Sequence, residues 1–275
     1  MIVDAHQHFW DPAAEDYPWM VGEELEPVRR RFDPEDLEPV LREHGVDGTV
    51  VVQAVGTSDE TQRLLAVAEA TPWVLGVVGW TDLRAADVAD ALAELKRGAL
   101  VGIRHQVHDE PDHAWLLRPD VQRGIAAVGE AGLAYDLLVR TAELPAALET
   151  ARRNPEMRFV VDHLAKPPLR DGDTTEWARG LEALSALPNV SCKLSGLVTE
   201  ADWSSWRSDE LVSYLRRALD WFGPSRTMFG SDWPVCLLAA DYGAVLELVL
   251  AALDGLDDAE RAAVLGGNAS RLYRL

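Results

Sequence analysis

Residues 49–80 read TVVVQAVGTSDETQRLLAVAEATPWVLGVVGW, and the class of fold can be inferred from this stretch. Its two ends, TVVVQA (49–54) and VLGVVGW (74–80), are almost continuously apolar, which is typical of parallel strands buried on both faces. Between them, SDETQRLLAVAEA starts at Ser58 with acidic residues in its first turn, where the helix dipole favours them. The stretch therefore predicts a strand–helix–strand unit.

The same alternation repeats along the chain. In the segment 33–45, Asp33 is a helix N-cap, Pro34 takes the first helical position and Gly45 follows the end. Eight strands alternating with helices over about 250 residues predict an α/β fold, a single (β/α)8 TIM barrel spanning residues 1–275. An open doubly wound sheet is the competing arrangement, but no GxGxxG turn follows the first strand, which argues against it. We expect no organic cofactor. The predicted strands are 2–6, 49–54, 74–80, 100–105, 134–139, 158–163, 189–195 and 226–232, and further helical segments are predicted at 58–70, 118–132, 141–154, 174–187, 208–223, 242–253 and 257–273.

The composition argues against several classes of protein. The chain has 46 Asp and Glu against 26 Lys and Arg, a formal net charge of −20, and such a field repels nucleic acids and anionic membranes. Cys192 and Cys236 form neither a disulfide framework nor a CxxC metal motif. No apolar run approaches the ~18 residues of a membrane span, and the first residues do not resemble a signal peptide. We therefore expect a cytoplasmic protein that acts on a small molecule and binds neither nucleic acid nor membranes, and the oligomeric state stays open.

The residues that could carry chemistry lie at strand ends, where barrel enzymes build their sites. The first strand ends in DAHQH, and because side chains alternate along a strand, Asp4, His6 and His8 should line one wall. Paired imidazoles suit a metal ion or a polarised carbonyl. The fourth strand ends in Arg104 and His105, of which only one can face inward, and the choice stays open.

Polar or aromatic residues end the other strands as well. Arg140 and Asp162 could belong to the site or could be ordinary ion-pair partners. The three longest connections, 8–33, 106–118 and 196–208, all follow strands and should surround the site. The remaining strand-end candidates are Gln53, Trp80, Asp136, His163, Lys193, Ser195, Asp232 and Trp233, with Lys166 just beyond the sixth strand.

Five blocks of the sequence resemble one enzyme superfamily. DAHQHFW (4–10), VVDHLAKPP (160–168) and MFGSDWPV (228–235) are similar to the amidohydrolase superfamily, specifically to amidohydrolase family 2. Together with GIRHQVHDEPD and CKLSGLVTEADW, they resemble its branch of sugar-lactone hydrolases, which includes the L-fuconolactone and L-rhamnonolactone hydrolases. The resemblance covers nearly the whole chain and implies a hydrolase that opens an aldono-lactone to the free acid.

The resemblance also implies roles for individual residues. Asp232 would be the base that activates water, while His6, His8 and His163 would polarise the carbonyl, with or without zinc. The residues that would hold the substrate are Arg104, His105, Lys166, Trp10 and Trp233. Gln53, Trp80 and Asp136 join this set of substrate-binding candidates because they lie at strand ends.

The metal content is open at this level. Members of the superfamily with two metals usually have a bridging Lys or Glu at strand four and a His ligand at strand five, whereas this chain offers Arg104 or His105 and then Asp136. This difference argues against a two-metal site. A single Zn²⁺ held by His6, His8 and Asp232 is chemically sensible, since three ligands leave a position for water. Some similar enzymes hydrolyse lactones with no metal, so both alternatives stand.

Two other reactions also stay open. A nonoxidative decarboxylase of an aromatic acid would share the HxH pair and the final Asp, and it would favour one zinc ion. A hydrolase of another lactone, such as a pyrone dicarboxylate, would be supported by two arginines at the mouth of the barrel, here Arg104 and Arg140.

Overall fold

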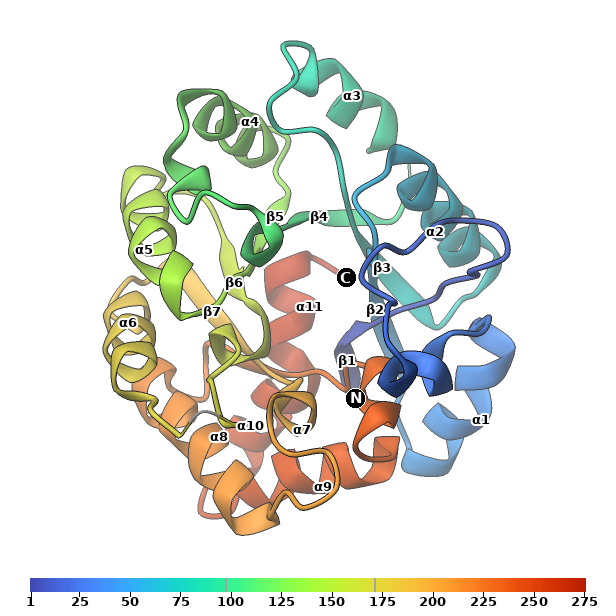
Figure 1. Cartoon of the computed structure of the whole chain (residues 1–275), viewed down its shortest axis with the longest axis vertical. Helices are drawn as coiled ribbons and strands as arrows, with labels where there is room; N and C mark the ends of the chain where they lie inside the picture. Colours follow the sequence, from blue (N-terminus) through green and yellow to red (C-terminus); the bar gives the residue numbers. More distant parts are fainter. Residues whose placement is uncertain (97, 171) are drawn as a thin grey trace.

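The predicted barrel is confirmed. The computed structural model describes residues 1–96, 98–170 and 172–275. In these ranges, eight strands, each parallel to its neighbour, form one sheet in the order β1 to β8, and helices surround it (Figure 1). Every strand overlaps one predicted apolar run. The strands are β1 Val3–Gln7, β2 Gly48–Val52, β3 Val74–Gly79, β4 Leu100–Gln106, β5 Ala134–Leu138, β6 Phe159–Val161, β7 Val190–Leu194 and β8 Thr227–Phe229.

Hydrogen bonds between the ends of β1 and β8 close the barrel. The backbone N–H of Asp232 donates to the carbonyl oxygen of His6 (2.8 Å), and the N–H of His8 donates to the carbonyl oxygen of Trp233 (2.7 Å). Gln7 and Trp233 form a parallel bridge at the same place. The first and last strands therefore present their polar residues side by side.

Asp4 fastens this seam from the outer side of the sheet, beneath α9 (Tyr242–Ala252). Its carboxylate accepts hydrogen bonds from the Ser231 N–H (2.9 Å) and the Tyr242 hydroxyl (3.1 Å). Burial raises the pKa of Asp4 to about 6. This placement corrects the prediction that Asp4 lines one wall with His6 and His8, because Asp4 is covered by β8 and the helix that follows it.

Within the described residues the helices follow the predicted segments with three differences, of which the first is the one-turn helix Leu197–Glu200 in the predicted connection 196–208. Val88–Leu95 forms a helix that the sequence analysis does not predict; its N-cap is Asp87, whose side chain makes no capping hydrogen bond. The segment 257–273 is two helices around a π-helical turn, where any side chain on Gly266 would come within 2.7 Å of the Met1 carbonyl oxygen. The helices are α1 Pro34–His44, α2 Ser58–Ala70, α3 Val88–Leu95, α4 Pro119–Glu130, α5 Leu144–Arg153, α6 Thr175–Ser185, α7 Leu197–Glu200, α8 Ser208–Phe222, α9 Tyr242–Ala252, α10 Asp258–Ala262 and α11 Asn268–Tyr273. Short 3₁₀ turns lie at Glu23–Val28, Val107–Asp109, Trp115–Leu117, Thr141–Glu143, Asp162–Ala165 and Val235–Leu238.

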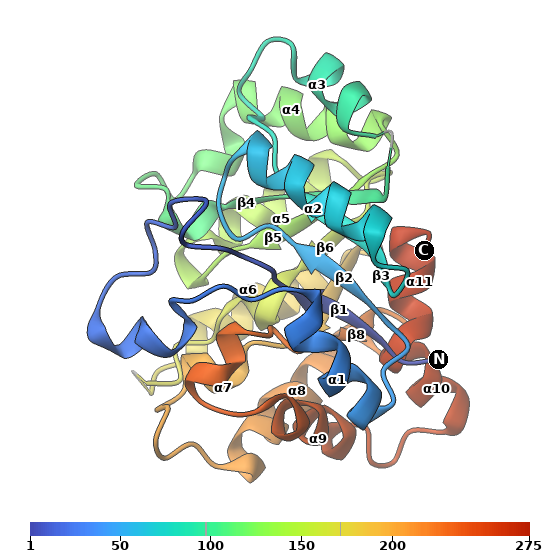
Figure 2. The ribbon, with the colours of Figure 1, turned by 90° about the vertical axis from the view of Figure 1, so that its right-hand side faces the viewer.

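The two ends of the barrel have different roles. α10 and α11 lie at the end where the strands begin, and the Tyr273 hydroxyl donates to the Asp136 carboxylate inside the barrel (2.8 Å). The loop before α1 and the region of α7 lie at the opposite end (Figure 2). Within the described residues, no helix has the length and apolar character needed to cross a membrane.

Candidate active site

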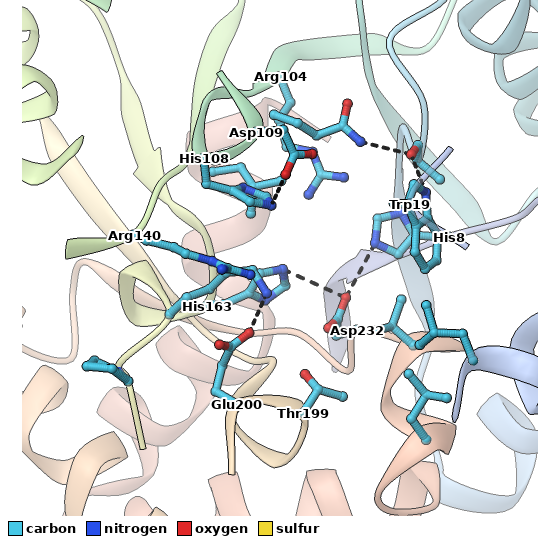
Figure 3. A pocket seen from close by; sticks show the side chains of 18 of the residues that line it. His8, Trp19, Arg104, His108, Asp109, Arg140, His163, Thr199, Glu200 and Asp232 are labelled. Atoms are coloured by element: carbon cyan, nitrogen blue, oxygen red, sulfur yellow. Dashed lines mark hydrogen bonds and ion pairs between the residues drawn. The ribbon is translucent and has the colours of Figure 1, made fainter. Parts of the chain in front are cut away.

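A cavity of about 740 Å³ opens at the end where the strands finish (Figure 3). Its size is in the range that accepts small molecules. All three long connections contribute to its wall, as the sequence predicts. The lining includes His8, Arg104, Arg140, His163, Lys166 and Asp232 near strand ends, Trp10, Trp19 and Leu25 from residues 8–33, His108 and Asp109 from residues 106–118, and Thr199, Glu200 and Trp203 from residues 196–208.

Asp232 lies at the centre of a cluster of three histidines. Its Oδ1 is 3.4 Å from His8 Nε2 and 3.8 Å from the Nε2 atoms of both His6 and His163. His8 Nδ1 lies 2.7 Å from the Val52 carbonyl oxygen, which can only accept, so that nitrogen carries the proton. The bare Nε2 of His8 therefore faces Asp232 Oδ1, and two electron-rich atoms converge on a place suited to a proton, a water or a cation.

The ionisation states of this cluster follow from burial. Burial lowers the pKa of His8 and lowers those of His6 and His163 well below their usual value. Burial alone would raise the pKa of Asp232, but His163 and the positive charge of the nearby Lys166 outweigh it and the pKa is lowered. At neutral pH the cluster therefore consists of one carboxylate facing three neutral imidazoles.

A second set of ionisable groups lies beneath this cluster and is balanced in charge. Lys193 Nζ is 2.6 Å from Asp136 Oδ2 and 2.9 Å from Asp162 Oδ1. Arg104 Nη1 donates to Asp162 Oδ2 at 3.0 Å. Both cations also contact His6, Lys193 Nζ at Nδ1 (3.1 Å) and Arg104 Nη1 at Nε2 (3.2 Å). This buried network, made of Arg104, Lys193, Asp136 and Asp162, holds His6 from below.

Of the two adjacent residues on strand β4, Arg104 is the one that faces the cavity. Arg104 is 3% exposed and lines the cavity. His105 points to the other face, where its ring stacks on Trp115 (4.2 Å between centroids) and its Nε2 lies 2.7 Å from Glu110. Adjacent side chains of a strand point to opposite faces, and this corrects the prediction that His105 contacts substrate. Gln53 is fully buried, and its Oε1 accepts from Arg104 Nη2 (3.2 Å), so it supports Arg104 and does not line the cavity.

The predicted aromatic and acidic binding residues divide in the same way. Trp10 lines the cavity, with its indole N–H donating to the Val28 carbonyl oxygen (3.0 Å). Trp80 donates to His105 Nδ1 outside the cavity, and Trp233 packs against the rings of Phe9 and Phe32. Asp136 lies in the buried network. The placement of Trp80, Trp233 and Asp136 corrects their prediction as substrate contacts, since Trp80 lies outside the cavity and Trp233 and Asp136 are buried away from it.

Several cavity residues are absent from the predicted set. Trp19 comes from the first loop, and His108 and Asp109 directly follow β4 in GIRHQVHDEPD. Glu200 lies 2.5 Å from Lys166 Nζ and sets the direction of that predicted cation. The three long connections indicate the right segments, but the sequence does not tell which side chain in a loop turns inward.

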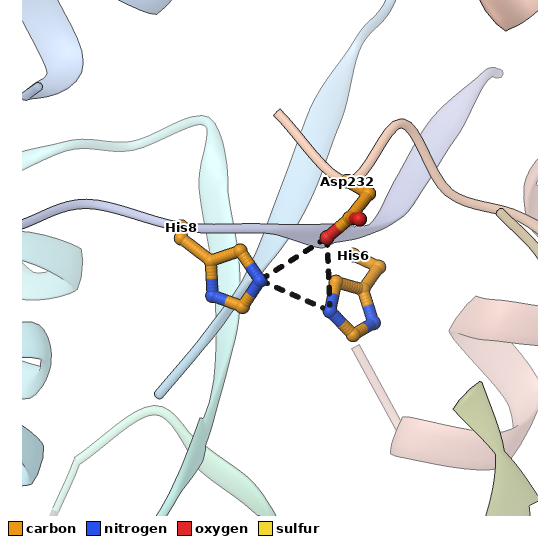
Figure 4. Close-up of side chains that lie close together, drawn as sticks. All are labelled: His6, His8 and Asp232. Atoms are coloured by element: carbon orange, nitrogen blue, oxygen red, sulfur yellow. Dashed lines mark hydrogen bonds and ion pairs between the residues drawn. The ribbon is translucent and has the colours of Figure 1, made fainter. Parts of the chain in front are cut away.

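The donor set of His6, His8 and Asp232 fits one metal ion (Figure 4). The three ligand atoms are 3.2, 3.4 and 3.8 Å apart. These distances are close to the separation of about 3.4 Å between ligands that each lie ~2.0–2.1 Å from a tetrahedral Zn²⁺. A second group, His6, Asp162 and His163, is also compact. Asp162 is already paired with Arg104 and Lys193, so this second group fits a cation less well.

Comparison with known proteins agrees with this geometry. The profile of the family described as "Amidohydrolase" matches residues 3–275. The chain is 44% identical over 281 residues to the L-fucono-1,5-lactonase of Burkholderia ambifaria, which covers 99% of this chain and 95% of that protein. A crystal structure of an amidohydrolase from Burkholderia multivorans with bound zinc is 43% identical, with a TM-score of 0.95 over 100% of this chain and 99% of that one. A structure from the same organism with bound HEPES is 42% identical, with the same TM-score and coverage. The chain belongs to the amidohydrolase family.

Proposed function

We propose that this protein is a sugar-lactone hydrolase that opens an aldono-lactone, such as L-fuconolactone or L-rhamnonolactone, to the free acid. The observation that carries the proposal is Asp232, an ionised carboxylate at the floor of a small-molecule cavity, facing neutral imidazoles and no cation within ion-pair distance among the described residues. The full-length similarity to an L-fucono-1,5-lactonase supports the same substrate class.

In the proposed reaction, Asp232 removes a proton from a water molecule that attacks the lactone carbonyl carbon. A positioned general base of this kind contributes about 10²–10⁴ in rate. His163 Nδ1 lies 2.8 Å from Ser195 Oγ; if it accepts from that hydroxyl, Nε2–H is left to donate to the carbonyl oxygen as it becomes negative. One such donor is worth about 10²–10³ in rate. When the ring C–O bond breaks, the proton on Asp232 passes to the leaving alkoxide.

The opposite wall is suited to the hydroxyl groups of the sugar. Lys166 is held by Glu200, while no ion-pair partner lies within 4.0 Å of the Arg140 guanidinium among the described residues. Burial, with Lys166 and Arg140 nearby, lowers the pKa of His108 to about 3, so its imidazole is neutral. His108 Nδ1 has no hydrogen-bond partner within the described residues. Lys166 and Arg140 offer donors to a polyhydroxy substrate, and Trp10 and Trp19 add flat apolar surface.

A zinc ion is part of the proposal as an option that the donor set allows. His6, His8 and Asp232 would hold it, and it would supply a Lewis acid at the carbonyl or the water. Arg104 Nη1, 3.2 Å from His6 Nε2, already places a positive charge beside the same nitrogen. The residues therefore provide electrophilic assistance from the protein's own groups as well.

The two alternative reactions are less supported. An aromatic-acid decarboxylase and a pyrone-dicarboxylate hydrolase would each fit the HxH pair and the final Asp. The relative that is 44% identical over nearly the whole chain carries the name of a sugar lactonase.

We also propose that residues 1–275 form one domain, because the family profile spans residues 3–275. The cytoplasmic location stays a prediction.

The test is a pH-indicator assay of the purified protein on L-fucono-, L-rhamnono-, L-galactono- and D-arabinono-lactone, with Asp232→Asn beside it. Acid release by the wild type that Asp232→Asn loses would support the proposal. A wild type that opens no lactone, but releases CO₂ from aromatic acids, would replace the proposal with the decarboxylase.

A further inference from the structure

The segment after β6 has an unusual backbone. His163, Leu164, Ala165 and Lys166 have φ angles of 53°, 53°, 55° and 49°. All four lie in the left-handed region although none is glycine. In that region Cβ approaches the following carbonyl oxygen, so such residues normally occur singly. Four in succession are held only where the surrounding structure over-determines them.

The turn sorts its side chains between the cavity and the core. Its ends are joined by a hydrogen bond from the Lys166 N–H to the His163 carbonyl oxygen (2.8 Å). Residues three apart in such a turn lie on one face, and His163 and Lys166 both line the cavity. Leu164 and Ala165, between them, are fully buried in the core. One backbone feature therefore aims two pocket side chains at once.

Two contacts from other elements hold the turn in this form. The Trp177 indole N–H, from α6, donates to the Leu164 carbonyl oxygen at 2.6 Å. Trp177 is itself fully buried, and its ring packs against Tyr214 and Trp221 of α8. On the other side, a Cβ on Gly196 would come within 2.5 Å of His163 Nδ1, so only glycine lets the loop after β7 press on the imidazole.

From this arrangement we propose that Trp177 is a positioning residue for the reaction: by locking the left-handed turn at residues 163–166, it sets both the reacting imidazole of His163 and the substrate-binding ammonium of Lys166. The inference rests on the proposed function for the roles of these two groups. Trp177 does not line the cavity, so it acts only through the turn.

The proposal predicts a specific kinetic pattern. Trp177→Phe keeps the aromatic packing but removes the N–H donor, so the turn loses its anchor. We expect kcat to fall at least tenfold, toward the ~10²-fold loss that a displacement of 1 Å can cause, and KM to rise as Lys166 moves. Lys166→Met should raise KM by a larger factor than it lowers kcat. The matched control is Trp206→Phe, which loses a similar indole bond, to the Ala239 carbonyl oxygen (2.9 Å), without touching the turn, and should keep both constants within about twofold.

A second pair of variants tests the turn even if Trp177→Phe does not fold. Glycine tolerates positive φ, so Ala165→Gly relieves strain while freeing the backbone. Ala147→Gly is the control, since Ala147 is equally buried but lies in the regular helix α5. We expect Ala147→Gly to lower Tm by several degrees, Ala165→Gly to lower it by at least about 2 °C less, and only Ala165→Gly to lower kcat.

The outcomes separate this inference from the proposed function. A folded Trp177→Phe protein with wild-type kcat and KM would overturn the positioning role. Equal losses of Tm in Ala165→Gly and Ala147→Gly, with kcat unchanged in both, would overturn it as well. A wild type with no lactonase activity would defeat the proposed function, and the Tm comparison would then still test the strained turn.

Discussion

Asp162 and Asp232 are both aspartates at the ends of barrel strands, and their surroundings are opposite. Asp162 is fully buried between Lys193 and Arg104, which hold its pKa well below the usual value even though burial works in the other direction. Asp232 is 3% exposed and faces the cavity, and all its ion-pair contacts among the described residues are with imidazoles. A carboxylate neutralised by two cations stabilises the structure, whereas one facing neutral groups and water is free to accept a proton.

The sharpest test of this difference is activity. Asp232→Asn should lower kcat for lactone hydrolysis by about 10³-fold, because the amide cannot take a proton from water. Its free energy of unfolding should change by less than about 1 kcal/mol, since no cation loses its partner. Kinetics and urea denaturation of the same preparation measure both. A kcat within tenfold of the wild type would move the base to another residue.

Asp162→Asn should instead lower mainly the stability of the protein. Lys193 would keep Asp136, but Arg104 would lose its carboxylate partner, and breaking a buried ion pair from one side costs about 3–5 kcal/mol of stability. Urea denaturation monitored by tryptophan fluorescence gives the value. Equal stability of Asp162→Asn and Asp232→Asn would contradict the claim that Asp162 supports the structure while Asp232 reacts.

Zinc binding extends the comparison to cations. A Zn²⁺ ion held by His6, His8 and Asp232 should stabilise the folded protein by about 2.7 kcal/mol at a free concentration 100 times its Kd. His8→Gln should abolish this gain. Thermal unfolding in chelator and in buffered zinc, for both proteins, provides the measurement. An equal gain in His8→Gln would place the ion elsewhere.

Glu60 is a third kind of buried carboxyl, and its titration gives the smallest expected effect, a change in how Tm depends on pH. Burial raises its pKa from 4.5 to about 7, while it accepts hydrogen bonds from the Ala54 and Val55 N–H groups. Because the folded state holds this proton more tightly than the unfolded state, stability should fall as pH rises from about 4.5 to about 7. Compared with Glu60→Gln, the wild type should lose several degrees more of Tm between pH 5 and pH 8. Parallel Tm curves would contradict the raised pKa.

The sequence predicts the barrel well because apolar runs and helix caps are local features. It also indicates the right end of the barrel, since polar residues at strand ends and long connections coincide there. The sequence does not indicate how deep a side chain lies: His6 on β1 and Asp136 on β5 are both polar strand residues, but only the packed structure shows that Asp136 lies under the site. The left-handed turn at 163–166 contains no glycine that would predict it from the sequence, and a tertiary contact from Trp177 stabilises it.

The seam between β1 and β8 has a consequence for how the enzyme comes into being. Asp4 and Ser231, joined by a hydrogen bond, are 227 positions apart in the chain, and His6 and Asp232 meet at the same place. A chain still emerging from the ribosome therefore carries the histidines long before their carboxylate. The reactive centre comes into existence only when the last strand docks on the first, so catalytic competence should appear late in synthesis and all at once.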